Sequence, residues 1–259
     1  MSFIEMSLYS DTLQMNVDVD MVLPAALPGK KLKVLWLYHG GNGDHGDWVR
    51  STNAIRFAEE RRVALIMPGV HNSCFVDMLH GPTYGTYIGK ELPDKIGKMF
   101  IILSEKREDN YVAGFSNGGY GCIRTALLYP ETFGYAGAFA AGDQEDNPFI
   151  NDGGRGAQNR VALFGDGNLQ QTEYSLKYCA RKLLNTDKPL PKIYHACGEF
   201  DPWYDKNQLV RLFFEGIKGN PFNYHYIEYK GLGHTDVFRE KALNECMNYW
   251  DLGVNSAER

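Results

Sequence analysis

Short apolar runs alternate with helical stretches along most of the 259-residue chain. Runs typical of buried strands cover residues 32–38, 63–67, 111–113, 135–140, 192–197 and 223–229, and helical stretches occur near 50–61, 91–105, 122–129 and 238–250. Strands that alternate with helices in this way predict a parallel sheet with helices on both faces. Two earlier strands, around 5–9 and 14–23, have the spacing of an antiparallel hairpin. The pattern therefore predicts an α/β fold with a mostly parallel central sheet and an antiparallel N-terminal edge.

One stretch, residues 143–188, separates two predicted strands by more than one helix requires. It starts with a polar segment and contains two glycine-rich loops. Insertions after the strands of such a sheet commonly cover a binding pocket, so we expect this one to lie over the site. The alternative is a surface excursion that covers nothing. No repeat or linker divides the chain, so residues 1–259 are predicted to form one domain.

The segment Gly114-Phe115-Ser116-Asn117-Gly118 places a serine in a Gly-x-Ser-x-Gly frame, directly after an apolar run and before a helical stretch. This is the pattern of a nucleophile elbow, in which a strained turn presents the serine hydroxyl at the end of a sheet strand. Only small neighbours allow such a turn, which accounts for the two glycines. A tight turn without catalytic function is the alternative for the pentapeptide alone.

Partners for this serine follow in the order that an α/β-hydrolase requires, serine, acid and then histidine. Asp201 follows the predicted strand at 192–197, and His234 follows the one at 223–229. We therefore predict that Ser116, Asp201 and His234 form a catalytic triad, with His234 as the base and Asp201 orienting its imidazole. Competing acids are Glu199, Asp205 and Asp236, which are otherwise solvated carboxylates or charges at helix N-termini.

Donors for an oxyanion are predicted at two backbone positions. Asn117 follows the nucleophile, and Gly41 lies in the glycine-rich loop after the strand at 32–38. His39, beside this loop, is expected to hold the loop backbone rather than to take part in catalysis. Trp203, close to Asp201, is the predicted substrate-pocket residue. The acidic and histidine residues at 44–47 lie on a glycine loop without helical pairing, so no metal is expected.

These residues resemble the esterase D-like α/β-hydrolase family, of the bacterial tributyrin and acetyl esterase type related to feruloyl esterases and S-formylglutathione hydrolases. The resemblance covers most of the chain and includes the elbow, Tyr38-His39-Gly40-Gly41, Asp47-Trp48, Met67-Pro68-Gly69 and Tyr129-Pro130-Glu131-Thr132-Phe133. It implies the α/β-hydrolase fold, the same triad and the same oxyanion pair. Two residues depart from the pattern, because Asn117 stands where the family often has Met and Gly41 where a bulkier apolar residue is common. Both departures affect the acyl site, so the resemblance implies the chemistry more firmly than the substrate.

Composition is compatible with such an enzyme. The net charge of −5 is spread along the chain without a basic block, so neither nucleic acid nor an anionic membrane is an expected partner. No apolar run approaches the roughly 20 residues of a membrane span, and the start of the chain lacks a signal-peptide pattern, so a cytoplasmic location is expected, with secretion open if a leader was removed. Five cysteines without a C-x-x-C pair predict reduced, buried thiols. The pattern leaves a homo-oligomer open.

Three functions follow from these residues. The first is a cofactor-independent serine carboxylesterase acting on short acyl esters, such as acetyl, butyryl or feruloyl esters or acylated saccharides. The second is a thioesterase of the S-formylglutathione type, since the same triad would serve a thiolate leaving group. The third is a hydrolase-like binding protein without catalysis, which the presence of all triad members disfavours.

Overall fold

The computed structural model describes residues 1–147 and 154–253. In this part of the chain, eight strands form one sheet in the order β1-β2-β4-β3-β5-β6-β7-β8. The strands are β1 (Ser2–Ser10), β2 (Met15–Leu23), β3 (Lys33–Tyr38), β4 (Val63–Pro68), β5 (Asn110–Phe115), β6 (Tyr135–Phe139), β7 (Lys192–Phe200) and β8 (His225–Gly233). The helical elements are α1 (Asp47–Ser51), α2 (Ala54–Arg61), α3 (Tyr84–Thr86), η1 (Tyr87–Glu91), α4 (Leu92–Met99), η2 (Arg107–Asp109), α5 (Asn117–Leu128), η3 (Gln144–Asp146), α6 (Arg155–Phe164), α7 (Leu176–Leu184), α8 (Tyr204–Glu215) and α9 (Asp236–Tyr249).

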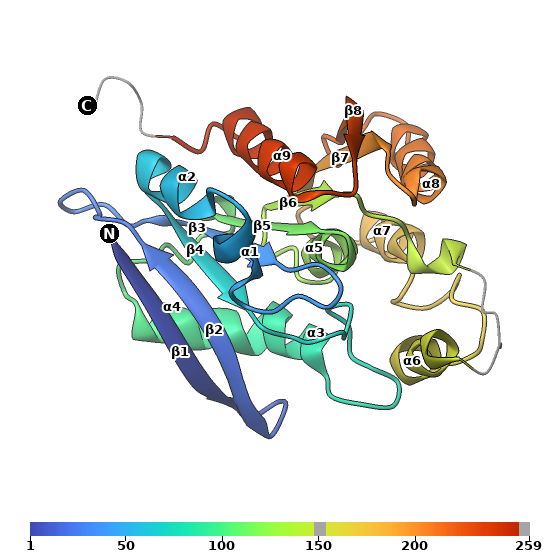
Figure 1. Ribbon diagram of the computed structural model, residues 1–259, viewed down its shortest axis with the longest axis horizontal. Coiled ribbons are helices and arrows are strands. Elements are labelled where there is room, and N and C mark those ends of the chain that lie inside the picture. Colours follow the sequence, from blue (N-terminus) through green and yellow to red (C-terminus); the bar gives the residue numbers. More distant parts are fainter. Residues whose placement is uncertain (148–153, 254–259) are drawn as a thin grey trace.

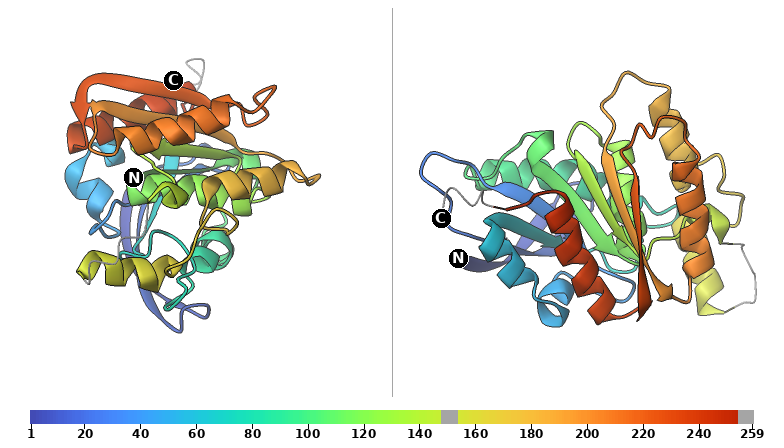
Figure 2. Two further views of the ribbon diagram at one scale, coloured as in Figure 1. Left: turned by 90° about the vertical axis from the view of Figure 1, so that its right-hand side faces the viewer. Right: turned by 90° about the horizontal axis from the view of Figure 1, so that it is seen from above.

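The directions of the strands confirm the predicted sheet. β1 and β2 pair as an antiparallel hairpin, and β2 is antiparallel to β4. The remaining neighbours, from β4 through β3 to β8, are parallel. The helices lie on both sides of this sheet (Figure 1 and Figure 2). The carboxyl ends of the parallel strands therefore meet at one edge, where loops from distant parts of the sequence come together.

Two hydrophobic cores cover the two faces of the sheet. Along β3, Val34, Trp36 and Tyr38 point into one core, which α4, α5 and α7 also enter. Leu35 and Leu37 point into the other, which α2 and α9 cover. A strand that is buried on both faces needs apolar residues at consecutive positions, which explains the uninterrupted run at 32–38.

Two predicted helices differ from those observed. The stretch near 50–61 forms two helices, because the Thr52 hydroxyl donates to Trp48 O at 2.6 Å and accepts from Ala54 N, and the backbone is extended at Thr52. Such local bonds of a threonine side chain compete with helix continuation. The helix predicted to end at 105 ends at Met99 instead, because Leu32 N bonds to Ile102 O and Ser104 N to Leu32 O, both at 2.9 Å.

The predicted insertion at 143–188 contains η3, α6 and α7, and its residues 148–153 lie outside the described residues.

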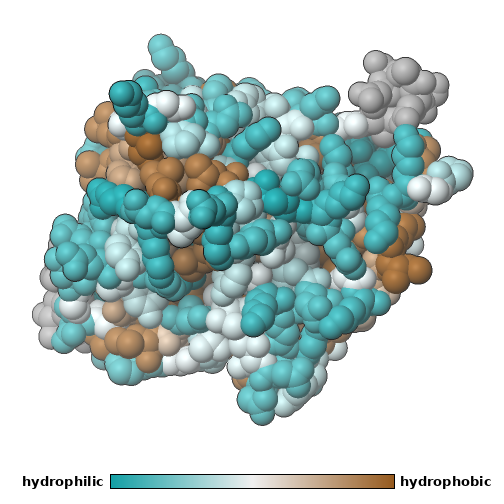
Figure 3. Space-filling model, turned by 180° about the vertical axis from the view of Figure 1, so that it is seen from behind, coloured by the Kyte–Doolittle hydropathy of each residue, from teal (hydrophilic) through white to brown (hydrophobic). Residues whose placement is uncertain are grey.

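None of the helices in the described ranges is long and apolar enough to cross a membrane. All five cysteines are buried and unpaired, as predicted. On the face opposite to that of Figure 1, hydrophilic side chains predominate and hydrophobic ones gather in separate patches (Figure 3).

Candidate active site

Ser116 occupies a strained turn between β5 and α5. Its φ is 57° and its ψ is −117°, a combination that a residue with a side chain rarely adopts. The flanking glycines are required by close backbone contacts. A methyl group added at Gly114 would lie 2.3 Å from Gly118 O, and one added at Gly118 would lie 2.4 Å from Tyr38 O. The local sequence thus forces the turn that exposes the Ser116 side chain beyond the end of the strand.

Asp201 and His234 are brought together by the register of β7 and β8. Phe200 pairs with Gly233 in these parallel strands, so the next residue of each strand lies beside the other. The Asp201 carboxylate accepts a hydrogen bond from His234 Nδ1 at 2.7 Å and, through its other oxygen, one from Trp203 N at 2.8 Å. With its Nδ1 proton held by the carboxylate, a neutral His234 presents an unprotonated Nε2.

The imidazole of His234 is also held by aromatic packing. The Phe115 ring centroid is 4.4 Å from that of His234, and the Trp203 ring meets the imidazole edge to face at 4.8 Å. The His234 side chain keeps 18% of its surface exposed, whereas that of Asp201 is fully buried. The histidine can therefore meet a substrate while the acid is shielded from water.

Gly41 and Asn117 lie close together and line the same cavity as Ser116. A methyl group added at Gly41 would lie 3.1 Å from Asn117 Nδ2. The loop that carries Gly41 is fixed from inside by His39, whose Nε2 accepts from Val70 N at 3.2 Å. Its Nδ1–H then donates to Gly40 O at 2.8 Å. In a trans peptide the N–H points away from the C=O, so a Gly40 carbonyl directed at His39 turns the Gly41 N–H away from it.

Burial lowers the pKa of His39, so the imidazole stays neutral and keeps its acceptor for Val70 N–H. His39 thus holds the loop backbone, in agreement with its interpretation from the sequence.

A cavity of about 710 Å³ joins these residues. Ser116, Asn117, Gly41, His234 and the predicted pocket residue Trp203 all line it, and Asp201 adjoins it through His234. Apolar lining comes from Cys74, Phe115, Tyr120, Ala140, Leu163, Phe164 and Trp203. Carboxamide side chains come from Asn42, Asn72, Asn117, Gln144, Asn147 and Asn159, and cations from Arg160, Lys206 and Arg239. The structure thus gathers the predicted site residues around one space that is polar over much of its surface.

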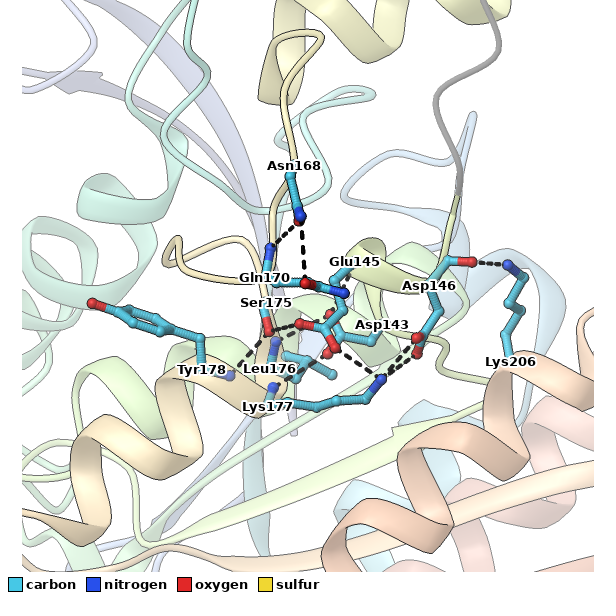
Figure 4. A network of polar contacts seen from close by, with 10 residues as sticks. All are labelled: Asp143, Glu145, Asp146, Asn168, Gln170, Ser175, Leu176, Lys177, Tyr178 and Lys206. Carbon is cyan, nitrogen blue, oxygen red and sulfur yellow. Dashed lines mark hydrogen bonds and ion pairs between the residues drawn. The ribbon is translucent and has the colours of Figure 1, made fainter.

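Part of the predicted insertion forms a wall of this cavity, through η3 and α6. A network of polar contacts holds η3 against α7 and α8 (Figure 4). Asp143, which is fully buried, accepts from Leu176 N and Lys177 N at the start of α7. Lys177 Nζ bonds to Glu145 and Asp146, and Lys206 Nζ donates to Asp146 O. Burial raises the pKa of Asp143 to about 7.

Asp47 and Arg239 are among the cavity residues that the sequence did not predict. Arg239 Nη1 forms an ion pair with Asp47 Oδ2 at 2.6 Å across the cavity wall. In the sequence Asp47 stands out only in the family resemblance and in the acidic loop at 44–47, and Arg239 follows no motif, since it is one of several charged residues in the last helix. Asp44, in the same acidic loop, forms an ion pair with Arg50.

Comparisons with known proteins agree with this geometry. The putative esterase family model matches residues 10–250. An acetyl esterase of Caldicellulosiruptor saccharolyticus is 29% identical over 96% of this chain and 98% of its own. A fluorophosphonate-binding serine hydrolase of Staphylococcus aureus superposes with a TM-score of 0.87 at 28% identity, and an S-formylglutathione hydrolase of the same organism with 0.84 at 28% identity. In both cases the match covers 96% of this chain and 98% of the other chain.

The sheet order, the strained serine turn and the match over residues 10–250 lead to one assignment. The chain has the α/β-hydrolase fold and belongs to the putative esterase family, within its esterase D-like group.

Proposed function

We propose that this protein is a serine carboxylesterase that hydrolyses short-chain acyl esters through an acyl-enzyme on Ser116. The observation that carries the proposal is the hydrogen bond of 2.7 Å between His234 Nδ1 and Asp201 Oδ2, with His234 on the same cavity as a serine in a strained turn. A strained serine beside an oriented histidine is the arrangement that acyl transfer requires.

Each residue then has a defined task. His234 Nε2 takes the Ser116 hydroxyl proton as Oγ bonds to the acyl carbon, and Asp201 stabilises the resulting imidazolium. The N–H groups of Gly41 and Asn117 bind the oxyanion of the tetrahedral intermediate. Collapse of that intermediate expels the alcohol, which takes the proton from Nε2. Water, activated by His234, then attacks the acyl-enzyme and releases the carboxylic acid and free Ser116. The proposed reaction uses no cofactor or metal.

The cavity lining bears on the leaving group. Six carboxamide side chains can each donate and accept hydrogen bonds, which suits an alcohol rich in hydroxyl groups, such as a saccharide. The similarity to an acetyl esterase supports acetyl as the acyl group. Butyryl and feruloyl esters are further candidates that the same chemistry would accept.

The second candidate is a thioesterase of the S-formylglutathione type. Lys206 and Arg160 line the cavity, and such cations favour a leaving group that carries carboxylates, as glutathione does. The similarity to an S-formylglutathione hydrolase supports this candidate as well.

Turnover of a substrate panel by the wild type and by Ser116→Ala tests the proposal. The panel contains p-nitrophenyl acetate, butyrate and octanoate, an acetylated xylo-oligosaccharide, methyl ferulate and S-formylglutathione. We expect wild-type turnover of a short ester and a loss of about 10⁶-fold in Ser116→Ala, the size found when a triad serine is removed. Ser7→Ala, on the exposed side of β1, is the matched control and should retain full activity.

The panel also separates the candidates. A kcat/KM that is highest for S-formylglutathione, together with a KM for it that rises in Lys206→Met while that for p-nitrophenyl acetate does not, would favour the thioesterase. Folded wild-type protein that turns over no ester or thioester would contradict both candidates and leave the non-catalytic binding protein.

A further inference from the structure

The loop of residues 39–46, which carries Gly41 and is called the oxyanion loop below, and the base His234 come from distant parts of the sheet. Gly41 follows β3 and His234 follows β8, and β5, β6 and β7 lie between these two strands. In the proposed reaction the Gly41 N–H must reach the acyl oxygen while His234 Nε2 reaches the Ser116 hydroxyl that attacks the acyl carbon. A displacement of about 1 Å between such groups can lower a rate by about 10²-fold. The relative position of the two loops therefore matters as much as the position of either one.

One partly buried ion pair connects the two loops. Arg239 lies in the first turn of α9, which begins directly after the His234 loop, and Asp47 is the first residue of α1, which begins after the oxyanion loop. Arg239 Nη1 and Asp47 Oδ2 are 2.6 Å apart, and their side chains are 3% and 21% exposed. A charge pair so shielded from water is coupled much more strongly than one on the surface.

The Asp47 end of the pair contacts the oxyanion loop. A methyl group added at Gly43 would lie 3.0 Å from Asp47 Oδ2, so the carboxylate packs directly on the loop backbone. The next residue, Trp48, donates from Nε1 to Tyr38 O at 3.0 Å, at the point where β3 ends. The Arg239 guanidinium lies over the Trp48 ring at 4.9 Å.

The Arg239 end of the pair contacts the surroundings of the base. Its guanidinium lies 5.4 Å from the centroid of Phe115, the ring that packs against the imidazole of His234. Arg239 Nη2 is 3.0 Å from Asp236 Oδ1, two residues after the base. The planar guanidinium thus contacts one carboxylate and one aromatic ring near each of the two loops. The ammonium group of a lysine cannot make this set of contacts.

We propose that Arg239 and Asp47 are a positioning pair that keeps the oxyanion loop in register with His234. The proposal rests on the proposed function, because it assigns the pair a role in placing the groups of that reaction. Arg239 acts through Asp47 on the loop of Gly41, and through Phe115 and Asp236 on the loop of His234. Loss of the pair leaves each loop with its own local bonds but removes the contact that sets the distance between them.

The kinetics of Arg239→Met, Arg239→Lys, Asp47→Asn and the double variant Asp47→Asn/Arg239→Met test this role, with p-nitrophenyl acetate as the substrate. We expect Arg239→Met and Asp47→Asn each to lower kcat by about 10- to 10²-fold, which is about 1.4 to 2.7 kcal/mol of transition-state stabilisation. KM should change by less than about threefold. The double variant should be no slower than the slower single variant, because both substitutions break one contact. Arg239→Lys should recover part of the loss.

The matched control is Arg50→Met, which breaks the ion pair with Asp44 on the same loop. That pair is exposed, with side chains 58% and 52% accessible, and it lies outside the contact between the two loops. We expect its kcat to stay within about twofold of the wild type. Circular dichroism and the unfolding midpoint of every variant show which proteins are folded at the assay temperature. If Arg239→Met does not fold, Asp47→Asn and Arg239→Lys carry the test, since both keep Arg239 or its charge beside Asp236.

Two results would overturn the proposal. Folded variants with a wild-type kcat would show that the pair only stabilises the fold. A KM that rises more than tenfold with an unchanged kcat would make Arg239 or Asp47 a substrate contact. Failure of the proposed function has a different signature, because wild-type protein would then be as inactive on every ester as Ser116→Ala.

Discussion

The Asp201 carboxylate and the His234 imidazole share a hydrogen bond of 2.7 Å, although the two residues are 33 positions apart in the sequence. The acid is fully buried and the imidazole partly exposed. Two adjacent parallel strands end together and create this contact. The same arrangement distinguishes Asp201 from the neighbouring acids Glu199, which accepts from Gly231 N, and Asp205, which lies in the first turn of α8.

Replacing Asp201 by Asn should lower kcat by about 10²- to 10⁴-fold, because an amide can no longer hold the Nδ1 proton and stabilise the imidazolium. Steady-state hydrolysis of p-nitrophenyl acetate measures the effect. Asp205→Asn is the matched control, and its exposed position predicts a change of less than about twofold. Equal activities of the two variants would assign the acid to another residue.

Replacing Gly118 by Ala should disrupt the serine turn. The new methyl group would lie 2.4 Å from Tyr38 O, so α5 must move away from the end of β3. We expect a loss of at least about 1–3 kcal/mol in the free energy of unfolding, together with most of the esterase activity. Urea denaturation and ester hydrolysis report the two effects. Gly167→Ala, which has open space around its added methyl group, should leave both values close to those of the wild type.

Replacing His39 by Ala should affect catalysis through the oxyanion loop. Val70 N–H loses its acceptor, and an unpaired buried N–H costs about 1–3 kcal/mol. Gly40 O keeps only the bond from Gly43 N, at 3.2 Å. Since the Gly40–Gly41 peptide is then held less firmly, we expect kcat to fall by about 10- to 10²-fold. Kinetics at a temperature where the variant is folded measure this loss, and His80→Ala, at an exposed position, is the control. An unchanged kcat in folded His39→Ala would mean that Gly41 needs no such support.

Acid should destabilise the protein through His195. This residue is fully buried between Tyr224 and Asn207, and burial lowers its pKa from 6.5 to about 4. The unfolded chain therefore takes up the proton first, so the stabilisation is complete above about pH 6.5 and is lost as the pH falls toward 4. The full effect is about 3 kcal/mol at 1.36 kcal/mol per pKa unit. Urea unfolding measures the free energy of unfolding at pH 7.5 and pH 5. Its decline between these two values should be smaller for His195→Gln, whose side chain is uncharged at both, than for the wild type. Equal declines would contradict a neutral buried His195.

The contribution of Asp143 to stability should decrease as the pH rises, opposite to that of His195. Its pKa is raised to about 7, chiefly by burial, so the unfolded chain releases the proton first as the pH rises. The contribution of Asp143 is complete below about pH 4 and is lost as the pH rises through 7. The advantage of the wild type over Asp143→Asn in the free energy of unfolding should therefore be larger at pH 5 than at pH 8. Asp166→Asn, at an exposed site, is the control. An advantage that grows with pH would mean that the helix N-terminus stabilises the Asp143 carboxylate.

Local signals carried most of the prediction of the fold. Apolar runs located the central strands, because a parallel strand is buried on both faces and cannot alternate with polar residues. The Gly-x-Ser-x-Gly frame located the turn at Ser116, because only glycine tolerates the close approach of backbone at Gly114 and Gly118. Helix ends were less predictable. The helix at 91–105 stops at Met99 because residues 102–104 bond to Leu32, a partner about 70 positions earlier that no local pattern announces.

The active site, like the fold, has features that local sequence predicts and features that depend on tertiary packing. The chain alone indicates which residues could do the chemistry and the order in which they occur, since each candidate follows its own predicted strand and turn. The distances between these residues depend on how the elements pack. The register of β7 and β8 puts Asp201 beside His234, and α6 supplies part of the cavity wall. The pair of Asp47 and Arg239 joins residues 192 positions apart. Such a contact depends on the packing of whole elements, and neither residue carries a local signal of the other.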